Sequence, residues 1–281
     1  MLLRCAMVLA YIAFCGVIAT RPCKYFQLNA KYFSRGPGIF SKLRIDRMIP
    51  DEWRLAQWAD DGVRAPAKYP VFAKPEWGQN AAGVRRADDA EQLRRIRADF
   101  VREEGRDEAR MLIQECAPGA NEYEIFSVRH HRDARPAMLT LTQACNDHEA
   151  HPVNSINNRH TRYADLTASL DAAQRDALWE MVRRIGDFPI SRVCARADSL
   201  GALLRGAFHV VEVNLFLPMP LNLLDRAHSR AHVLRFALAC MWRLALATRH
   251  RDKRAADAPV FIMSMLYNRR GVFARALRAR L

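Results

Sequence analysis

Short apolar runs, separated by turns and amphipathic stretches, dominate the pattern of the chain after its first forty residues. The runs are too short for helices, and glycine, proline or charged residues bound them, which is typical of β-strands. The predicted strands are residues 69–75, 111–116, 122–131, 136–143, 188–197 and 208–216.

Other stretches carry apolar residues at the spacing of one helix face. In residues 87–105, Leu93, Ile96 and Phe100 recur at helical intervals behind an acidic first turn. The other predicted helices are residues 42–62, with a break at Pro50, residues 171–186, and the stretch from Arg226 to the end. Because strands and helices interleave without a strict alternation, we expect an α+β fold.

An uncharged apolar segment runs from Cys5 to Thr20. As a helix, its 16 residues would span about 24 Å, short of the roughly 30 Å hydrocarbon core of a bilayer. A buried strand or helix, a membrane anchor and a signal peptide are the three interpretations, and we favour the first. The basic residues that follow, such as Arg21 and Lys24, would keep the bulk of an anchored protein on the cytoplasmic side. We therefore expect a cytoplasmic protein, with membrane association through residues 5–20 left open.

The chain is strongly basic, with a formal net charge of +14. Only six of its 44 basic residues are lysines, and the arginines are spread along the whole sequence, which indicates a compositional bias and not a designed basic stripe. Nucleic acid is therefore not the partner we expect. The seven cysteines include no C-x-x-C pair, so we predict neither a disulfide framework nor a zinc knuckle. Scattered, unpaired cysteines are typical of proteins in a reducing compartment, which is what we expect here.

Residues 69–84 join one lysine to a glycine-containing loop. Lys74 ends a predicted strand, and Gly78 and Gly83 follow it. Glycines let backbone N–H groups approach an anion, and a lysine next to them would neutralise phosphate charge. An idle, solvated lysine is the alternative interpretation of this segment by itself.

A second segment ends a predicted strand in a turn with two carboxylates, Glu115 and Glu122, around Cys116 and Pro118. Such a turn can present backbone groups to a purine and a carboxylate to ribose hydroxyls. An ordinary acidic surface turn is the competing interpretation.

In the third segment, Glu212 and Asn214 stand two residues apart in an apolar strand and therefore project to the same side. Hard oxygen ligands on one face, near Asp198 of the preceding strand, suit Mg²⁺ held together with nucleotide phosphates. A polar pair in so apolar a strand costs stability unless something satisfies it.

The order and spacing of the three segments resemble the ATP-grasp superfamily, whose familiar member is D-alanine:D-alanine ligase. The resemblance covers about residues 40 to 225 and implies two α+β lobes that enclose a nucleotide cleft. It implies the following roles: ATP binding by Lys42, Lys74, Gly78, Gly83, Glu115, Cys116, Pro118 and Glu122, metal binding by Glu212 and Asn214, and stabilisation of the reacting centre by Arg192 together with Lys74.

Two departures from the family pattern matter. The family's metal aspartate sits two residues after the arginine that Arg192 matches, where this chain has Cys194. A neutral thiol is a poor Mg²⁺ ligand, so we expect Asp198, four residues on, to substitute for it, unless it forms a structural ion pair with Arg196. The family's N-terminal domain is also reduced here. The implied division is a short N-terminal segment 1–41, a small lobe 42–125 with phosphate loop and hinge, a large lobe 126–225 with the metal site, and a helical C-terminal extension 226–281.

The resemblance implies an enzyme that uses ATP and Mg²⁺ to activate a substrate carboxylate as an acylphosphate for capture by an amine or similar nucleophile. Two alternatives stay open from the sequence. One is a degenerate ATP-grasp module that binds nucleotide without turnover, and the other is a membrane-associated basic scaffold. The substrate and the oligomeric state do not follow from the sequence.

Overall fold

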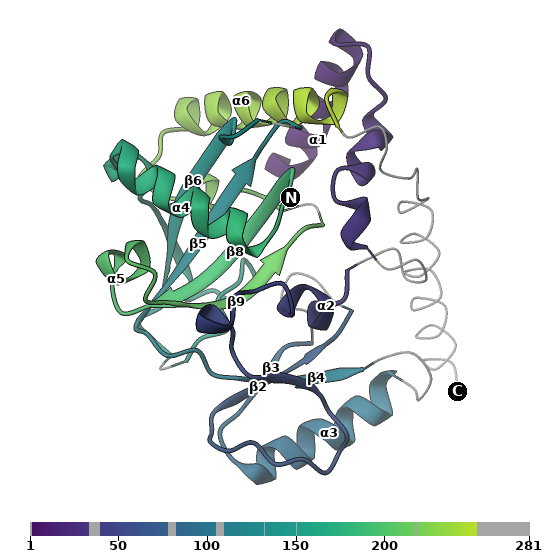
Figure 1. The fold of residues 1–281 in the computed structure, drawn as a ribbon, viewed down its shortest axis with the longest axis vertical. Coiled ribbons are helices and arrows are strands. Elements are labelled where there is room, and N and C mark those ends of the chain that lie inside the picture. The colour runs from purple at the N-terminus through teal and green to yellow at the C-terminus, as the bar shows by residue number, and fades with distance from the viewer. Residues whose placement is uncertain are drawn as a thin grey trace.

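The computed structural model describes residues 2–33, 40–77, 83–104, 110–131, 133–149, 151–216 and 218–251. These residues form two α+β lobes, with a pair of helices packed against one end of the larger lobe (Figure 1). The α+β class and the two-lobe arrangement predicted from the sequence are confirmed.

The smaller lobe is an antiparallel sheet covered on one face by a helix. Its elements are α2 (Lys42–Asp46), η3 (Asp51–Trp53), β1 (Gln57–Ala59), β2 (Val71–Pro75), β3 (Arg85–Ala87), α3 (Ala90–Glu104) and β4 (Met111–Glu115), with the strand order β1-β4-β2-β3. The apolar face of α3, with Leu93 and Ile96, packs on Val71, Ala73 and Ile113 of the sheet. The helical periodicity in the sequence therefore marks the buried face of α3.

The larger lobe is a five-stranded antiparallel sheet in the order β7-β6-β5-β8-β9. Its elements are β5 (Asn121–Val128), β6 (Met138–Cys145), β7 (Arg162–Asp165), η4 (Thr167–Ser169), α4 (Ala172–Ile185), β8 (Ile190–Ala197), α5 (Leu200–Leu204), β9 (His209–Asn214) and η5 (Leu221–Leu224). Helix α4 begins with a capping box formed by Asp171 and Gln174, and it buries Leu178 and Val182 against one face of the sheet.

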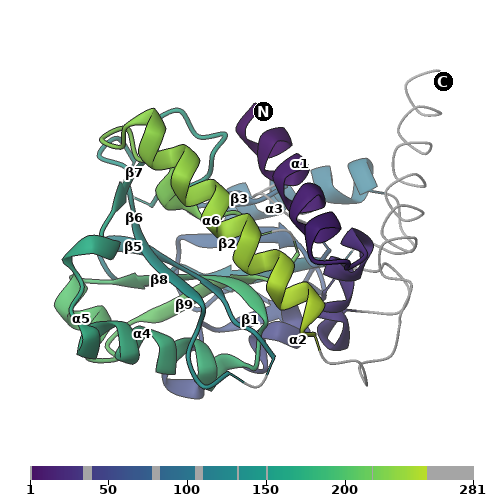
Figure 2. The ribbon, with the colours of Figure 1, turned by 90° about the horizontal axis from the view of Figure 1, so that it is seen from above.

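Two helices from opposite ends of the described chain lie side by side above the other face, as Figure 2 shows. They are α1 (Leu2–Val17) and α6 (Arg230–Arg249), and the short helices η1 (Pro22–Gln27) and η2 (Ala30–Tyr32) follow α1. Tyr11 of α1 makes a hydrogen bond of 3.0 Å with Thr248 of α6, and Cys15 and Cys240 are fully buried between the helices and the sheet. The pair closes one end of the sheet by apolar packing.

The outward face of the helix pair is apolar and exposed, with Val8, Leu9, Ile12, Val17, Leu234, Leu238 and Trp242. Residues 5–20, expected to be a buried element, are thus buried on one face only, through residues such as Met7 and Tyr11. Among the described residues, α6 is the one helix whose length and composition would allow it to cross a membrane, and core helices meet the same criterion.

One predicted helix is wrong in its second half. Residues 42–62 were expected to be helical with a break at Pro50, but α2 ends at Asp46 and Gln57–Ala59 form strand β1. The pairing of Gln57 with Gln114 of β4 replaces helical hydrogen bonds in this stretch. Such a pairing joins residues far apart in sequence, so local periodicity does not reveal it.

The two sheets meet at the hinge between Glu115, the last residue of β4, and Asn121, the first residue of β5. Strand β5 therefore runs through the boundary predicted between residues 125 and 126. At Gly119, with φ of 104°, an added Cβ would lie 2.8 Å from the backbone of Ala197, so the hinge passes too close to β8 for any larger residue. Of the predicted helical extension, α6 is described, and residues 252–281 lie outside the described part.

Candidate active site

The face of the larger sheet opposite α4 carries ionisable side chains inside the protein. Side chains alternate between the two faces along a strand, so the residues between the apolar core positions all point to this second face. They include Glu122 and Glu124 of β5 and Cys194 and Arg196 of β8, and each of these four residues is buried. Burial of so many ionisable groups costs free energy unless ligands or partners compensate.

Strand pairing places these side chains in rows across the sheet. Glu124 lies opposite Cys194 on the β5–β8 ladder, and Cys194 lies opposite Glu212 on the β8–β9 ladder. Glu122 lies opposite Arg196 in the same way. Because directly opposed residues in antiparallel strands have Cβ atoms about 5 Å apart, each row forms a continuous polar surface.

A cleft of about 1030 Å³, its open mouth included, separates this polar surface from the smaller lobe. The smaller lobe and the hinge contribute Lys42, Lys74, Gln114, Glu115 and Ala117 to its lining, and the larger sheet contributes Glu122, Glu124, Tyr163, Arg192, Cys194, Arg196 and Glu212. The apolar side chains Leu55, Phe72, Val84 and Val211 complete part of the wall. The cleft thus combines apolar walls with charges of both signs.

Two buried lysines face the larger sheet across the cleft. The Nζ atom of Lys74 donates to Oε1 of Gln114 at 2.9 Å, and that of Lys42 donates to the carbonyl of Pro75 at 2.9 Å. Burial lowers the pKa of Lys74 to about 8, although the Glu212 carboxylate opposes the shift. Burial lowers the pKa of Lys42 as well, again against Glu212. Because burial dominates both shifts, an anionic ligand in the cleft would favour the charged form of both ammonium groups.

The two carboxyl groups opposite the lysines have raised pKa values, which favour their neutral form. Burial, with the neighbouring Glu124 carboxylate, raises the pKa of Glu122 to about 7. Burial also raises the pKa of Glu124, although Arg192 lowers it in part. Ligand atoms of Glu122, Glu124 and Cys194 all lie within 4.8 Å of one another. Added positive charge in this part of the cleft would relieve the repulsion among them.

Arg192 is fixed between the acidic cluster and a loop. Its Nε atom lies 3.1 Å from Oε2 of Glu124, and its Nη1 atom donates to the carbonyl of Met219 at 3.3 Å. Burial by itself would lower the pKa of Arg192, but the carboxylates of Glu124 and Glu212 outweigh it and raise the pKa. The guanidinium is thus a permanent cation on the wall of the cleft.

The donor set at the end of β9 fits a hard divalent cation. Asn214 follows Glu212 on the same face of the strand, and its buried Oδ1 atom has no hydrogen-bond partner among the described residues. Carboxylate and amide oxygens are the ligands that Mg²⁺ prefers. Cys194 does not fit, because burial and the surrounding carboxylates raise the pKa of its thiol well above the ordinary value and keep it neutral.

The structure brings half of the predicted site residues to this cleft. Those that line it are Lys42, Lys74, Glu115, Glu122, Arg192 and Glu212, whereas Asn214 is buried beyond Glu212 and is not among the lining residues. Cys116 and Pro118 are not among its lining residues, because the hinge turns them away: Sγ of Cys116 lies 3.3 Å from Nδ1 of His151, and Pro118 is exposed. Ala117, between them, is buried and lines the cleft instead.

Asp198 does not replace the missing metal aspartate. It was expected to share the side-chain direction of Cys194 in a longer strand, but β8 ends at Ala197 and Ser199 begins α5. Asp198 is exposed in the turn between them and does not line the cleft.

Of the two predicted loop glycines, Gly78 lies outside the described residues. Gly83 is described, and its φ of 72° falls in the left-handed region that favours glycine. An added Cβ at Gly83 would lie 2.9 Å from the ring of Pro75, at the end of β2, so the loop returns closely onto the strand that carries Lys74. The next residue, Val84, lines the cleft.

Sequence reasoning missed Glu124 and Arg196. Glu124 stands two residues after Glu122, and Arg196 stands two residues after Cys194. The alternation of polar and apolar positions that identified Glu212 and Asn214 would have identified both. Tyr163 was missed because its short edge strand carries no apolar run.

Neither the scan against protein-family models nor the search of curated proteins found a match. Solved structures are similar in fold. An L-amino acid ligase from Bacillus licheniformis matches with 15% identity and a TM-score of 0.42, over 62% of this chain and 40% of that one.

The VanG D-Ala:D-Ser ligase from Enterococcus faecalis matches with 14% identity and a TM-score of 0.47, over 74% of this chain and 61% of that one. The D-alanine–D-alanine ligase from Bacillus anthracis matches with 12% identity and a TM-score of 0.43, over 74% and 66%. The chain thus spans about two fifths to two thirds of the length of these ligases.

Proposed function

We propose that the protein is an ATP-dependent ligase that joins a carboxylate to an amine. One observation carries the proposal: two buried lysines, Lys42 and Lys74, face Glu212 of the larger sheet across a single cleft, and Asn214 follows Glu212 on the same face of β9. A triphosphate with a bound divalent cation carries charges of both signs that complement this arrangement. It would pair with both ammonium groups and satisfy the orphaned Asn214 oxygen.

The nucleotide is proposed to lie with its base against the hinge and its phosphates between the lysines. Glu115 and Ala117 line the cleft at the hinge, where backbone groups can meet a purine edge. Glu122, at the start of β5, stands where a carboxylate would accept hydrogen bonds from ribose hydroxyls. The cation held by Glu212 and Asn214 would neutralise charge that develops on the phosphates.

The reaction follows from this placement in two steps. A substrate carboxylate oxygen attacks the γ-phosphorus, the bond to the ADP oxygen breaks, and an acylphosphate forms. An amine then attacks the acyl carbon, and inorganic phosphate leaves. Positioning and charge neutralisation supply most of the catalysis in such transfers, so Lys74 would stabilise the phosphate and Arg192 the oxyanion. Because the reaction consumes ATP, the proposal places the protein in the cytoplasm.

The first test is a thermal-unfolding comparison with and without Mg-ATP. Ligand at 100 times its Kd stabilises a folded protein by about 2.7 kcal/mol, which the wild type should show as a higher midpoint. Lys74→Met and Glu212→Gln should each lose this shift, because Lys74→Met removes a positive charge that faces the phosphates and Glu212→Gln removes a negative charge that would hold the cation. Lys68→Met and Glu180→Gln are the matched controls, since both side chains are exposed and outside the cleft. A wild type that ignores Mg-ATP, or cleft variants that keep the full shift, would refute the proposal.

A second measurement separates ligation from binding alone. ADP release is followed with a mixture of amino acids as carboxylate and amine donors, and Lys74→Met should reduce it at least about 100-fold. The neutral thiol of Cys194, in the place of a metal aspartate, favours a second candidate, a nucleotide-binding module without turnover. That candidate predicts the Mg-ATP shift without any ADP release.

A further inference from the structure

A second group of metal-ligating side chains lies where the edge strand β7 ends and α6 begins. Asp165 is the last residue of β7, His228 precedes the N-cap of α6, and His232 lies in its first turn. One ligand atom from each of the three residues lies within 4.8 Å of the other two. The sequence separates Asp165 from the histidines by more than sixty residues, and the fold alone brings them together.

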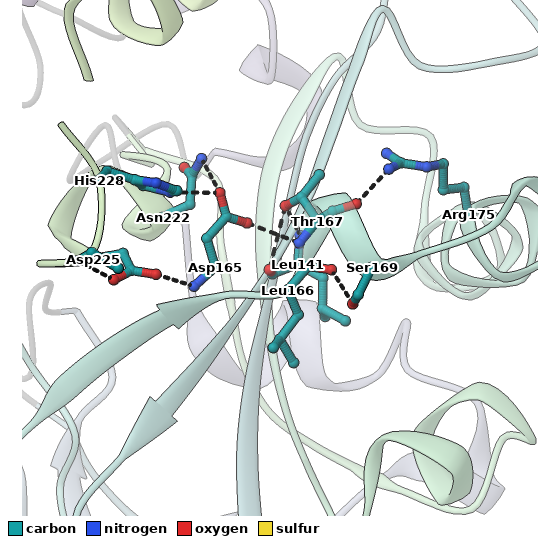
Figure 3. Close-up of polar contacts among 10 residues, drawn as sticks. Leu141, Asp165, Leu166, Thr167, Ser169, Arg175, Asn222, Asp225 and His228 are labelled. Carbon is teal, nitrogen blue, oxygen red and sulfur yellow. Dashed lines mark hydrogen bonds and ion pairs between the residues drawn. The ribbon is translucent and has the colours of Figure 1, made fainter. Parts of the chain in front are cut away.

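The carboxylate of Asp165 is held in a fixed orientation (Figure 3). Its Oδ1 atom accepts from the backbone N–H of Thr167 at 2.9 Å, and its Oδ2 atom accepts from Nδ2 of Asn222 at 3.2 Å. Asp225 in turn accepts from the backbone N–H of Asp165 at 2.7 Å. This support is the kind that orients a ligand before a metal ion arrives.

The two imidazoles lie beside that carboxylate. Nε2 of His228 lies at hydrogen-bond distance, 3.0 Å, from Oδ2 of Asp165, a separation that a cation about 2.1 Å from each atom can also bridge. The rings of His228 and His232 stack with centroids 4.0 Å apart and an interplanar angle of 22°, so binding of one ion by both nitrogens requires one ring to turn out of the stack. Ser229 accepts from the backbone N–H of His232 at 3.2 Å and so fixes the start of the helix that carries it.

Nε2 of His232 is buried and has no hydrogen-bond partner among the described residues. An unsatisfied buried polar atom costs about 1–3 kcal/mol, so a ligand for it would be stabilising.

The donor set selects a different kind of cation from the cleft. Two imidazole nitrogens and one carboxylate oxygen suit zinc and similar divalent transition metals, whereas the oxygens of Glu212 and Asn214 suit Mg²⁺. We propose that Asp165, His228 and His232 bind one divalent transition-metal ion that pins the N-terminus of α6 to strand β7. The proposal does not depend on the function proposed for the cleft.

The bound ion would also stiffen one wall of the cleft. Tyr163, two residues before Asp165 on β7, lines the cleft, and so does Leu221, next to Asn222. Tyr163 and Asp165 pair with Ala144 and Thr142 of β6. A metal ion at Asp165, the last residue of β7, would therefore hold the end of this edge strand in place.

Cobalt(II) is the probe for the test, because its visible spectrum reports ligand type. The wild-type protein is stripped with a chelator and titrated with Co²⁺, and one equivalent should bind with weak visible bands of a nitrogen and oxygen site. Zn²⁺ should displace the cobalt and raise the thermal-unfolding midpoint. Intense sulfur-to-cobalt bands in the near ultraviolet would instead assign the ion to cysteines and overturn the proposal.

Two site variants and one control decide the ligands. His232→Ala and Asp165→Asn should each weaken Co²⁺ binding by more than about tenfold and remove the Zn²⁺-induced rise in midpoint. His148→Ala removes an exposed histidine whose ring also lies against that of a second one, His160, and this variant should bind the metal as the wild type does.

Circular dichroism establishes first that each variant is folded. Should His232→Ala fail to fold, Asp165→Asn decides, because asparagine keeps the oxygen that accepts from Thr167. Wild-type affinity in the folded site variants, or equal losses in the His148 control, would overturn the proposal.

Discussion

The two faces of strands β5 and β8 differ in polarity and charge, although alternate residues of the same two strands form them. On one face Tyr123, Ile125, Val193 and Ala195 pack under α4 and are almost inaccessible. On the other face Glu122, Glu124, Cys194 and Arg196 are also buried, although slightly less, and are ionisable. Strand pairing fixes both faces at once, so the apolar face determines where the polar side chains of the cleft point.

The apolar face under α4 stabilises the fold, whereas the ionisable face that lines the cleft lowers its stability. Apolar burial contributes roughly 25 cal/mol per Å² of surface removed from water. A buried carboxyl or ammonium group loses hydration that only a partner or ligand restores. We therefore expect substitutions on the α4 face to lower stability without changing the ligand response, and substitutions on the cleft face to do the opposite.

The largest effect on stability should come from Ile125→Ala. Ile125 is fully buried on the α4 face, and large-to-small substitution there leaves a cavity that costs about 4 kcal/mol. Urea unfolding at constant pH measures the loss. The additional stabilisation by Mg-ATP should keep its wild-type size, and a loss of that response in a folded Ile125→Ala protein would contradict the separation of the two faces.

Glu122→Gln should stabilise the ligand-free protein, by about 2 kcal/mol at pH 8. Burial raises the pKa of Glu122 to about 7, so between the ordinary value of 4.5 and about 7 the unfolded chain loses a proton that the folded protein keeps. Stability of the wild type therefore falls as pH rises through that window, at about 1.4 kcal/mol per pH unit for one group. Glutamine removes the titration but stays polar and buried, which makes the net gain smaller.

The measurement for this variant is urea unfolding at pH 4 and pH 8. The gain in stability of Glu122→Gln over the wild type should be absent at pH 4, where the carboxyl is largely protonated in both states and only the cost of the buried amide remains. Its Mg-ATP response should also weaken, because the proposed ribose contact is altered. Equal stability of the two proteins at pH 8 would contradict the raised pKa. Asp176→Asn, an exposed carboxyl on α4, is the control without a pH-dependent gain.

The sequence predicted the parts of the fold that local patterns determine. The apolar runs that became β2, β4, β8 and β9 and the periodicity of α3 need only neighbouring residues to be read. Strand β1 was assigned to a helix, because its pairing with β4 depends on the folded chain. The pairing order of the sheets has no local signal for the same reason.

The cleft followed the same rule. Glu212 and Asn214 were found because two polar residues interrupt an apolar strand, a local pattern. Asp198 was assigned wrongly, since its side-chain direction depended on where β8 ends. The histidines at the start of α6 were missed, because their carboxylate partner lies on β7 and their spacing of four residues is a weak signal by itself.

Cys194→Asp should have the smallest effect and the most specific one. An aspartate at this position would stand opposite both Glu124 and Glu212, so the ligand-free protein should lose about 1 kcal/mol through repulsion among carboxylates. The same oxygen is a hard ligand that the thiol is not, so half of the maximal Mg-ATP response should need about fivefold less Mg²⁺. Cys194→Ser is the matched control, because it changes size without adding charge and should leave the Mg²⁺ requirement unchanged. The measurement is the unfolding midpoint at fixed ATP and increasing Mg²⁺. Equal Mg²⁺ requirements in the aspartate and serine variants would show that position 194 does not contribute to the cation site proposed on the cleft face.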